Sequence, residues 1–173
     1  MELTFIQEMS LEEIKLRGRV MTMATDLEML LLRIFLYCLI QTPDEVLYFF
    51  KKMVLETKIS KAKKFLKEVH PDKYEEYKST FKDLKAIGKF RNKFAHCTIL
   101  WDKKGKDKSY FNLVIIAEID GKESFRIIKM TFYEFNEKVK KMLSVIMSLA
   151  NLSKSIEDEF NYKYPDFFNS SMA

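Results

Sequence analysis

The chain has 173 residues, of which 47% are hydrophobic and 32% are charged, and its net charge is +5. This composition is that of a globular protein, and the length suits one domain with a single core. With only four glycines and three prolines, the chain has little room for a loop-rich or all-β fold. The mild positive charge permits an acidic partner such as RNA without requiring one.

The two cysteines, Cys38 and Cys97, are too few for a disulfide framework, which favours a reducing compartment. The first ten residues carry two glutamates and lack a basic start, so we expect no cleavable signal peptide. The most apolar run, 27–40, is interrupted by Glu28 and Arg33, which indicates a buried helix rather than a membrane span. We therefore expect a cytoplasmic protein without membrane attachment.

Apolar residues at three- and four-residue steps predict a long first helix from Ser10 to about Gln41, opened by a capping box of Ser10 and Glu13. The segment Thr42-Pro43-Asp44 ends this helix. A short helix is expected next, followed by another over about 60–69. The apolar residues of the short helix are Val46, Phe49, Phe50 and Met53.

His70-Pro71-Asp72 interrupts the helical pattern, and Asp72 with Glu75 predicts a second capping box. A long helix should then run to about Leu100, before a charged turn over 102–108. Two runs rich in β-forming residues, 110–118 and 124–130, flank Asp120-Gly121, which is a strong hairpin signal.

A final helix is predicted over about 133–154, and the tail from Glu157 is rich in aromatic residues that could fray or pack on a partner chain. The fold class expected from these elements is mainly α. It is an up-and-down bundle of four to five helices, with a β-hairpin inserted at about 110–130 before the last helix. We expect one domain over 1–155 and a C-terminal tail over 156–173.

The most informative segment is Arg91-Asn92-Lys93-Phe94-Ala95-His96, near the end of the predicted long helix. It combines one of the two histidines of the chain with a permanent cation and an amide. A guanidinium can bind a phosphate through two hydrogen bonds, and an imidazole can transfer a proton near neutral pH. These are the minimum groups for cleaving an RNA backbone without a metal.

An arginine, a polar residue directly after it and a histidine beyond four intervening residues, on a helix of a small bundle, resembles the HEPN superfamily. The matching residues are Arg91, Asn92 and His96, and the similar helix order covers roughly residues 10–155. The resemblance implies a homodimer in which two motif helices face each other across a cleft. It also implies a metal-independent endoribonuclease that uses the ribose 2′-hydroxyl as nucleophile.

The same resemblance implies the role of each residue. His96 is the general acid or base, Arg91 binds the scissile phosphate, and Asn92 orients either group. Helix geometry partly agrees, because Asn92 and His96 share a face whereas Arg91 is offset from His96 by about 140°. The second subunit would then complete the site. Many relatives are toxins or defence effectors, so a separate antitoxin chain is an implied partner.

Further residues are candidates for supporting this site. Asp26 and Glu28 are carboxylates inside an apolar helical run, where charged residues need a reason. Glu28 could hold Arg91 or His96 in place, or it could instead pair with Arg33 or face solvent. The lysines nearest the motif are candidate RNA contacts, namely Lys89, Lys93, Lys103 and Lys104.

Two other interpretations stay open. His96 can be a core histidine with a satisfied hydrogen bond, in which case the chain is a non-catalytic, dimeric HEPN-like module that binds RNA or protein. His70-Pro71-Asp72 also resembles the tripeptide of J-domain co-chaperones, although the opening segment of that family is absent. A J-domain needs this tripeptide on an exposed loop, whereas Pro71 and Asp72 can simply end one helix and begin the next.

We expect neither a metal nor another cofactor. The two histidines and two cysteines lack the spacing of metal ligands, and no glycine-rich phosphate loop occurs in the sequence. Cys97 directly follows His96, and adjacent helical residues point about 100° apart, which argues against a nucleophilic Cys-His pair.

Overall fold

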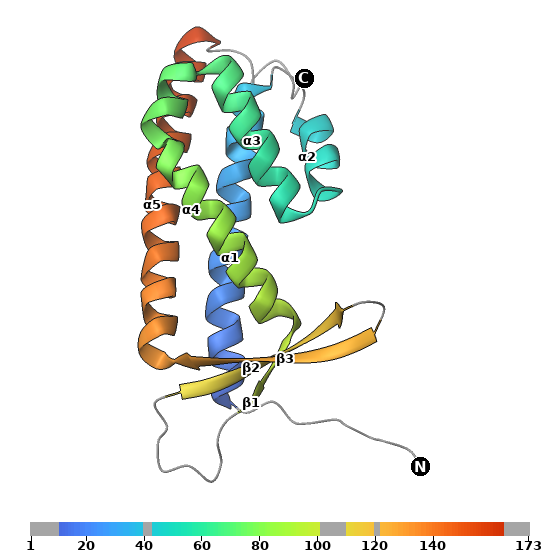
Figure 1. Ribbon diagram of the computed structural model, residues 1–173. Coiled ribbons are helices and arrows are strands. Elements are labelled where there is room, and N and C mark those ends of the chain that lie inside the picture. Colours follow the sequence, from blue (N-terminus) through green and yellow to red (C-terminus); the bar gives the residue numbers. More distant parts are fainter. Residues whose placement is uncertain (1–10, 40–42, 101–109, 120–121, 165–173) are drawn as a thin grey trace.

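A computed structural model of the chain describes residues 11–39, 43–100, 110–119 and 122–164. Over these residues the protein is mainly helical, and a three-stranded antiparallel sheet precedes the last long helix, so the expected fold class is confirmed (Figure 1). The elements are α1 (Leu11–Cys38), α2 (Pro43–Lys51), α3 (Leu55–Val69), α4 (Pro71–His96), β1 (Cys97–Leu100), β2 (Tyr110–Ile119), β3 (Lys122–Thr131) and α5 (Phe132–Lys163).

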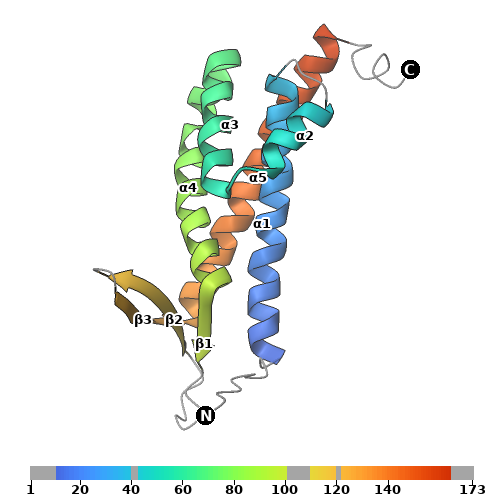
Figure 2. The ribbon, with the colours of Figure 1, turned by 90° about the vertical axis from the view of Figure 1, so that its right-hand side faces the viewer.

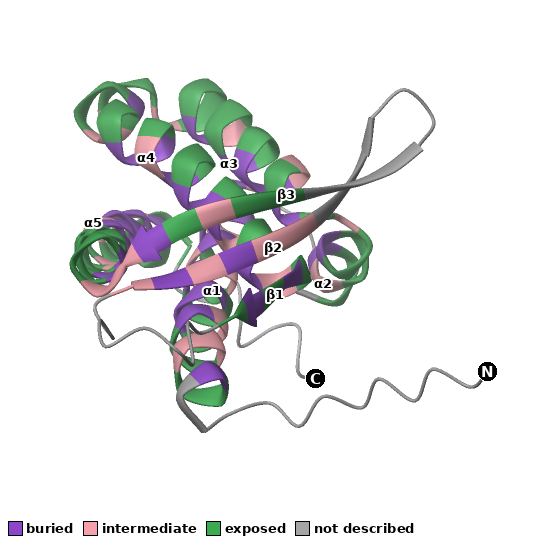
Figure 3. Ribbon diagram, turned by 60° about the horizontal axis from the view of Figure 1, so that its bottom comes forward, coloured by how far each residue is buried: buried purple, intermediate pink, exposed green. Residues whose placement is uncertain are grey.

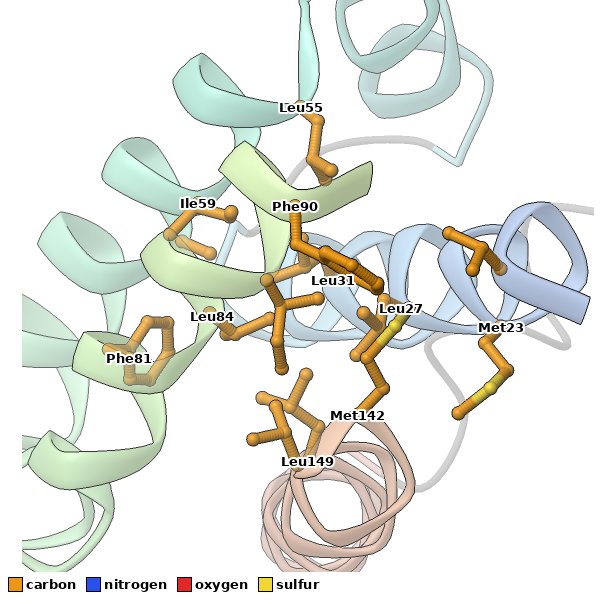
Figure 4. Packing of buried hydrophobic residues seen from close by; sticks show 14 of the residues in the cluster. Met23, Leu27, Leu31, Leu55, Ile59, Phe81, Leu84, Phe90, Met142 and Leu149 are labelled. Carbon is orange, nitrogen blue, oxygen red and sulfur yellow. The ribbon is translucent and has the colours of Figure 1, made fainter. Parts of the chain in front are cut away.

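The long helices α1, α4 and α5 run along the length of the bundle, and α3 packs on α4 and α1 (Figures 1 and 2). Their apolar faces meet in one core, which Figure 4 shows from close by. Within the described residues, no helix combines the length and the apolar character needed to cross a bilayer. The labelled core residues come from four helices: Met23, Leu27, Leu31, Leu55, Ile59, Phe81, Leu84, Phe90, Met142 and Leu149.

An aromatic cluster fixes the last turns of α4 against the sheet and α5. The Phe94 ring lies 5.4 Å from the Phe135 ring and 6.3 Å from the Phe111 ring, measured between centroids, and it is fully buried. Phe90, one turn earlier, lies 4.8 Å from Phe94. Aromatic pairs at such separations add about 0.5–1.5 kcal/mol each beyond the area they bury. The turn of α4 directly before His96 is therefore tightly packed.

The sheet lies across the end of the bundle where α4 finishes (Figures 1 and 3). β2 pairs with β3 in one register from Tyr110↔Thr131 to Ile119↔Lys122, which brackets Asp120-Gly121 and confirms the hairpin. The turn residues themselves lie outside the described residues. Buried and half-buried residues alternate at the start of β2, where Phe111 and Leu113 are fully buried.

The predicted end of the long helix at about Leu100 was wrong, because α4 ends at His96 and Cys97 begins β1. The four residues of β1 pair antiparallel with β2, from Cys97↔Ile115 to Leu100↔Asn112. Thr98 and Ile99 are β-branched and fit a pleated strand. The expected charged turn over 102–108 lies outside the described residues.

Other predicted helix ends also shifted. α3 begins at Leu55 rather than near residue 60, since Leu55 and Ile59 extend its buried stripe. α5 continues to Lys163, so the expected tail over 156–173 is helical in its first part, and Ile156 and Phe160 are buried. The last helix of the bundle therefore continues beyond residue 155. Phe160 packs against Tyr37 of α1, with 5.5 Å between ring centroids.

The helix caps differ from those expected. Ser10 of the first predicted box lies outside the described residues. At α4, His70 is the N-cap and Pro71 occupies the first helical position, so the predicted cap by Asp72 was wrong. A capping box instead opens α5, where the Thr131 hydroxyl accepts from the Glu134 amide at 3.1 Å and the Glu134 carboxylate accepts from the Thr131 amide at 2.8 Å.

Candidate functional site

His96 is the last residue of α4, and its side chain is exposed. The helix passes directly into β1, since Cys97 is the first residue of that strand. Phe94 and Cys97, on either side of His96 in the chain, are buried, so the backbone there is fixed while the imidazole points outward. This exposure does not fit the interpretation of His96 as a core histidine. An exposed imidazole can exchange protons with a bound substrate.

Asn92 lies one turn before His96 on the same face of α4, and it is also exposed. Arg91 is half-buried, and its Nη1 donates a hydrogen bond of 3.1 Å to the Asn92 Oδ1. The Nε of Arg91 is buried and has no hydrogen-bond acceptor among the described residues. Arg91 therefore turns toward Asn92, which reduces the angular offset that the helix sets between Arg91 and His96.

None of the contacts that the structure describes joins Arg91 to His96 within one chain. They are five positions apart in the sequence, and Arg91 is the less exposed of the two. The three motif residues thus form an Arg91–Asn92 pair and a separate His96 at the end of the helix. A site that uses all three on one substrate needs the substrate, or a second copy of the chain, to bridge this gap.

Arg17 of α1 is a residue of this region that sequence reasoning missed. Its Nη1 donates to the carbonyl oxygen of Phe94 at 2.6 Å, and its Nη2 donates to the carbonyl oxygen of Cys97. These carbonyls lie on either side of His96, at a helix end where backbone acceptors lose their intrahelical partners. Arg17 therefore fixes the backbone on both sides of the imidazole.

Glu13 holds Arg17 in this position. Its Oε1 accepts from the Nη2 of Arg17 at 2.9 Å and from the Nε at 3.1 Å. Both side chains are largely buried, with 20% of Arg17 and 10% of Glu13 exposed. The sequence offered one signal for the pair, namely opposite charges four residues apart on a helix. It did not indicate that their partner was the end of α4.

One of the two expected supporting acids has a partner outside the motif. Glu28 forms an ion pair with Lys58 of α3, whose side chain is only 8% exposed and lies over the Phe50 ring. Among the described residues, no hydrogen bond or ion pair joins Glu28 to Arg91, His96 or Arg33. Asp26 is exposed on α1. Glu28 serves the packing of α1 against α3, which is the reason for a carboxylate in this apolar run.

The expected RNA contacts are placed in part. Lys89 and Lys93 are exposed, and both line a groove between α4, the sheet and the start of α5. Helical spacing puts them on the same face as His96, because the three residues are separated by four and three positions. Lys103 and Lys104 lie outside the described residues.

His70 occupies a different environment from His96. It lies between α3 and α4 with 10% of its side chain exposed, and its Nδ1 is 3.4 Å from the Glu159 carboxylate. Lys73 and Lys163 also contact Glu159, at 3.7 Å and 2.7 Å. His70-Pro71-Asp72 is therefore a helix junction with a largely buried histidine. It does not form the exposed loop that the J-domain interpretation requires.

The two thiols are poor nucleophiles. Burial raises the pKa of Cys38 to about 12, and burial also raises the pKa of Cys97. Cys97 is further engaged with the Phe94 carbonyl, 3.7 Å from its Sγ. Within the ranges described, no group of three or more His, Cys, Asp and Glu residues could hold a metal ion.

Comparison of the chain with protein families, with curated proteins and with solved structures found no match.

Proposed function

We propose that this chain is a metal-independent endoribonuclease of the HEPN type, with Arg91, Asn92 and His96 as its site residues. The observation that carries the proposal is the exposed His96 at the end of α4, on the same face as Asn92, whose amide oxygen holds the Arg91 guanidinium. The position of this motif in a helical bundle with a hairpin before the last helix supports the same resemblance.

The proposed reaction breaks one phosphodiester bond and needs two proton transfers. The ribose 2′-oxygen bonds to phosphorus as the bond from phosphorus to the 5′-oxygen of the next nucleotide breaks. One imidazole removes the proton of the 2′-hydroxyl, and a second, protonated imidazole donates a proton to the leaving 5′-oxygen. The products are a 2′,3′-cyclic phosphate and a 5′-hydroxyl.

A homodimer supplies both imidazoles, because each chain has one exposed histidine in the motif. Arg91 donates hydrogen bonds to the scissile phosphate and stabilises the charge that develops on its oxygens. Asn92 accepts a hydrogen bond from the Nη1 of Arg91 and so holds this end of the guanidinium toward the face that carries His96. This arrangement accounts for the gap between Arg91 and His96 in one chain, since the partner subunit's motif can meet it across the cleft. A role as a toxin or defence effector, with a separate antitoxin, belongs to the same proposal.

One observation favours a second candidate function. Arg91 is half-buried and its Nε lies inside the protein, so part of the guanidinium is withdrawn from any substrate. A non-catalytic dimeric module that binds RNA or protein tolerates this placement, whereas an enzyme needs the side chain to swing outward.

The test is RNA cleavage in EDTA by the purified protein, compared with His96→Ala and Arg91→Ala. Both variants are first checked for unchanged helicity and for unchanged mass in solution. The proposal requires that the parent cuts RNA to 2′,3′-cyclic phosphate ends and that both variants lose the activity. A folded parent that cuts none of a broad RNA panel overturns the enzyme, and RNA binding without cleavage then assigns the second candidate function.

A further inference from the structure

A groove of about 600 Å³ lies where α4, the sheet and α5 meet, and we call it the α4–α5 groove. It is lined by α4 between Ala86 and Lys93, by β2 and β3 residues including Lys129, and by α5 between Tyr133 and Lys141. These three elements come together at the lower end of the bundle in Figure 1. At 1.5 Å per residue, the α4 wall is about 10 Å long.

The cations of this groove outnumber its anions. Five lysines line it from three elements: Lys89, Lys93, Lys129, Lys138 and Lys141. Its two carboxylates are already used, because Glu134 caps α5 through Thr131 and Glu137 pairs with Lys140 at 2.7 Å. Lys141 pairs with Asp83. None of the other four lysines forms a salt bridge within the described part of the chain. Lys129 lies over the Tyr110 ring and Lys138 over the Phe90 ring, so an anionic ligand competes only with these weaker contacts and with the attraction of Glu134 for Lys138.

The floor of the groove is apolar, and one rim is aromatic. Phe90, Leu113 and Met130 form buried parts of the lining. Tyr133 lies at the start of α5 with 73% of its surface exposed, and it lines the groove. A cationic wall beside an exposed aromatic ring is the combination that binds single-stranded nucleic acid. The cations contact phosphates, and unstacked bases lie on the ring.

The candidate catalytic histidine does not line the groove, but it lies about one turn beyond the α4 wall. Lys89 and Lys93 lie on the groove and on the face of α4 that ends at His96, three residues beyond Lys93. A strand held along these lysines passes the imidazole as it leaves the groove. A flexible single strand can follow such a groove, and its unstacked bases are free to lie on an aromatic ring.

We infer that the α4–α5 groove binds single-stranded RNA and delivers it to His96, with Lys89, Lys129 and Lys138 on phosphates and Tyr133 stacked on a base. The ligand class rests on the proposed function. The binding site itself rests on the charge, the exposed ring and the apolar floor. RNA contacts thus extend well beyond the motif helix, onto the sheet and α5.

The test measures binding of a fluorescein-labelled oligouridine of twelve nucleotides by fluorescence anisotropy. The protein carries His96→Ala, so that bound RNA is not consumed. In this background, Lys89→Gln with Lys138→Gln should raise Kd about tenfold or more. The slope of log Kd against log salt should fall by about 1.4, because each lost single-strand phosphate contact removes about 0.7. Tyr133→Ala should raise Kd about fivefold or more, as expected for one lost stacking contact.

A matched control keeps the change of charge and moves it away from the groove. Lys61→Gln with Lys67→Gln removes two exposed lysines of α3 and should change Kd less than about threefold. Lys89→Arg with Lys138→Arg keeps both charges and should retain binding. All of these residues are exposed, and unchanged melting of each variant confirms that the fold is intact.

The outcomes test RNA binding in the groove separately from the proposed ribonuclease activity. If the groove variants and the control variant lose RNA affinity equally, the groove is not the RNA-binding site, whether or not the parent cleaves RNA. Equal binding of a duplex of the same length overturns the single-strand assignment, and full competition by polyglutamate reassigns the groove to an acidic peptide. If the groove variants lose binding but the parent protein never cleaves RNA, the groove stands and the proposed enzyme falls.

Discussion

The two histidines of this protein mark the two ends of α4, and their surroundings differ. At the first end, His70 is largely buried and lies 3.4 Å from Glu159 of α5, among lysines that share the same carboxylate. At the other end, His96 is exposed while the backbone around it is fixed by Arg17 and by the cluster of Phe94. At the first end the imidazole of His70 is part of the packing. At the other end the backbone is fixed and the imidazole of His96 is exposed to solvent.

This difference separates a structural histidine from a candidate catalytic one. A group that serves catalysis must reach substrate, and its position must be set by contacts that do not use its own reactive atoms. His96 meets both conditions, because Arg17 and the aromatic cluster act on its backbone neighbours. His70 meets neither, because the nitrogen it presents already faces a carboxylate.

The largest expected effect tests this contrast directly. His96→Gln should lower RNA cleavage by about 100-fold to 10,000-fold, because a general acid or base commonly contributes that much. His70→Gln should leave the cleavage rate of folded protein within about threefold, since its imidazole lies at the far end of α4. The measurement is the initial rate on one labelled RNA, with both variants at equal folded concentration. Comparable losses in the two variants would contradict the contrast.

Arg17 should show the next largest effect. Arg17→Ala removes charge-assisted hydrogen bonds to two backbone carbonyls and leaves Glu13 without this cation, so we expect the free energy of unfolding to fall by about 2–3 kcal/mol. The measurement is urea unfolding, combined with hydrogen exchange at the end of α4 and in β1.

The control for Arg17 is Lys15→Ala, which removes an exposed cation of the same helix and should change stability by less than about 0.5 kcal/mol. If exchange stays slow near His96 in Arg17→Ala, then the aromatic cluster alone holds this backbone, and Arg17 contributes to stability only.

Much of the fold could be predicted from local patterns. The apolar periodicity that predicted the long helices is the pattern that builds the core, and Asp120-Gly121 placed the hairpin correctly. Two of the failures share one cause. β1 is a strand because β2 lies beside it, and the last turns of α5 are helical where Phe160 reaches Tyr37. The sequence of one segment does not show which distant segment will lie beside it.

The same limit applies to the candidate site. His96 and its neighbours were found from a short motif, and the exposure of His96 fits its proposed role. The partner of Glu28 was not predictable, because Lys58 lies thirty residues away and reads as one of several lysines on a basic helix. Arg17 was missed because its acceptors are backbone carbonyls, which every residue has and no sequence pattern identifies.

The Glu28–Lys58 pair allows a smaller test, which asks whether Glu28 acts in stability or in catalysis. Glu28→Gln leaves the largely buried Lys58 without its counter-charge, and we expect a loss of about 1–2 kcal/mol in the free energy of unfolding. The cleavage rate of folded protein should stay unchanged, because the pair joins α1 to α3. Asp26→Asn is the matched control, since it neutralises an exposed carboxylate of α1 and should change neither quantity. A loss of cleavage in Glu28→Gln at full stability would restore Glu28 as a supporting acid.

The smallest expected effect is a pH dependence of stability at the His70 end. The pKa of His70 is lowered from its ordinary 6.5, chiefly because burial penalises the charged imidazole; Lys73 and Lys163 act in the same direction and Glu159 opposes them. The unfolded chain therefore takes up a proton more readily than the folded one. The stabilising contribution is complete above the ordinary histidine pKa and is lost as the pH falls through the lowered value.

Urea unfolding at about pH 7.5 and about pH 5.5 measures the contribution of His70 to stability. Both pH values lie above the range in which Glu159 titrates, so the protonation of this carboxylate does not add to the difference. The pKa of Glu159 is itself lowered from 4.5, mainly by its hydrogen bond from Lys163, so this carboxylate stays charged at both pH values. The parent protein should lose stability on acidification, and His70→Gln should lose less. A parent that gains stability at the lower pH would mean that the attraction of Glu159 outweighs burial. His70 would then be an ion-pair partner in the folded protein rather than a neutral, packed imidazole.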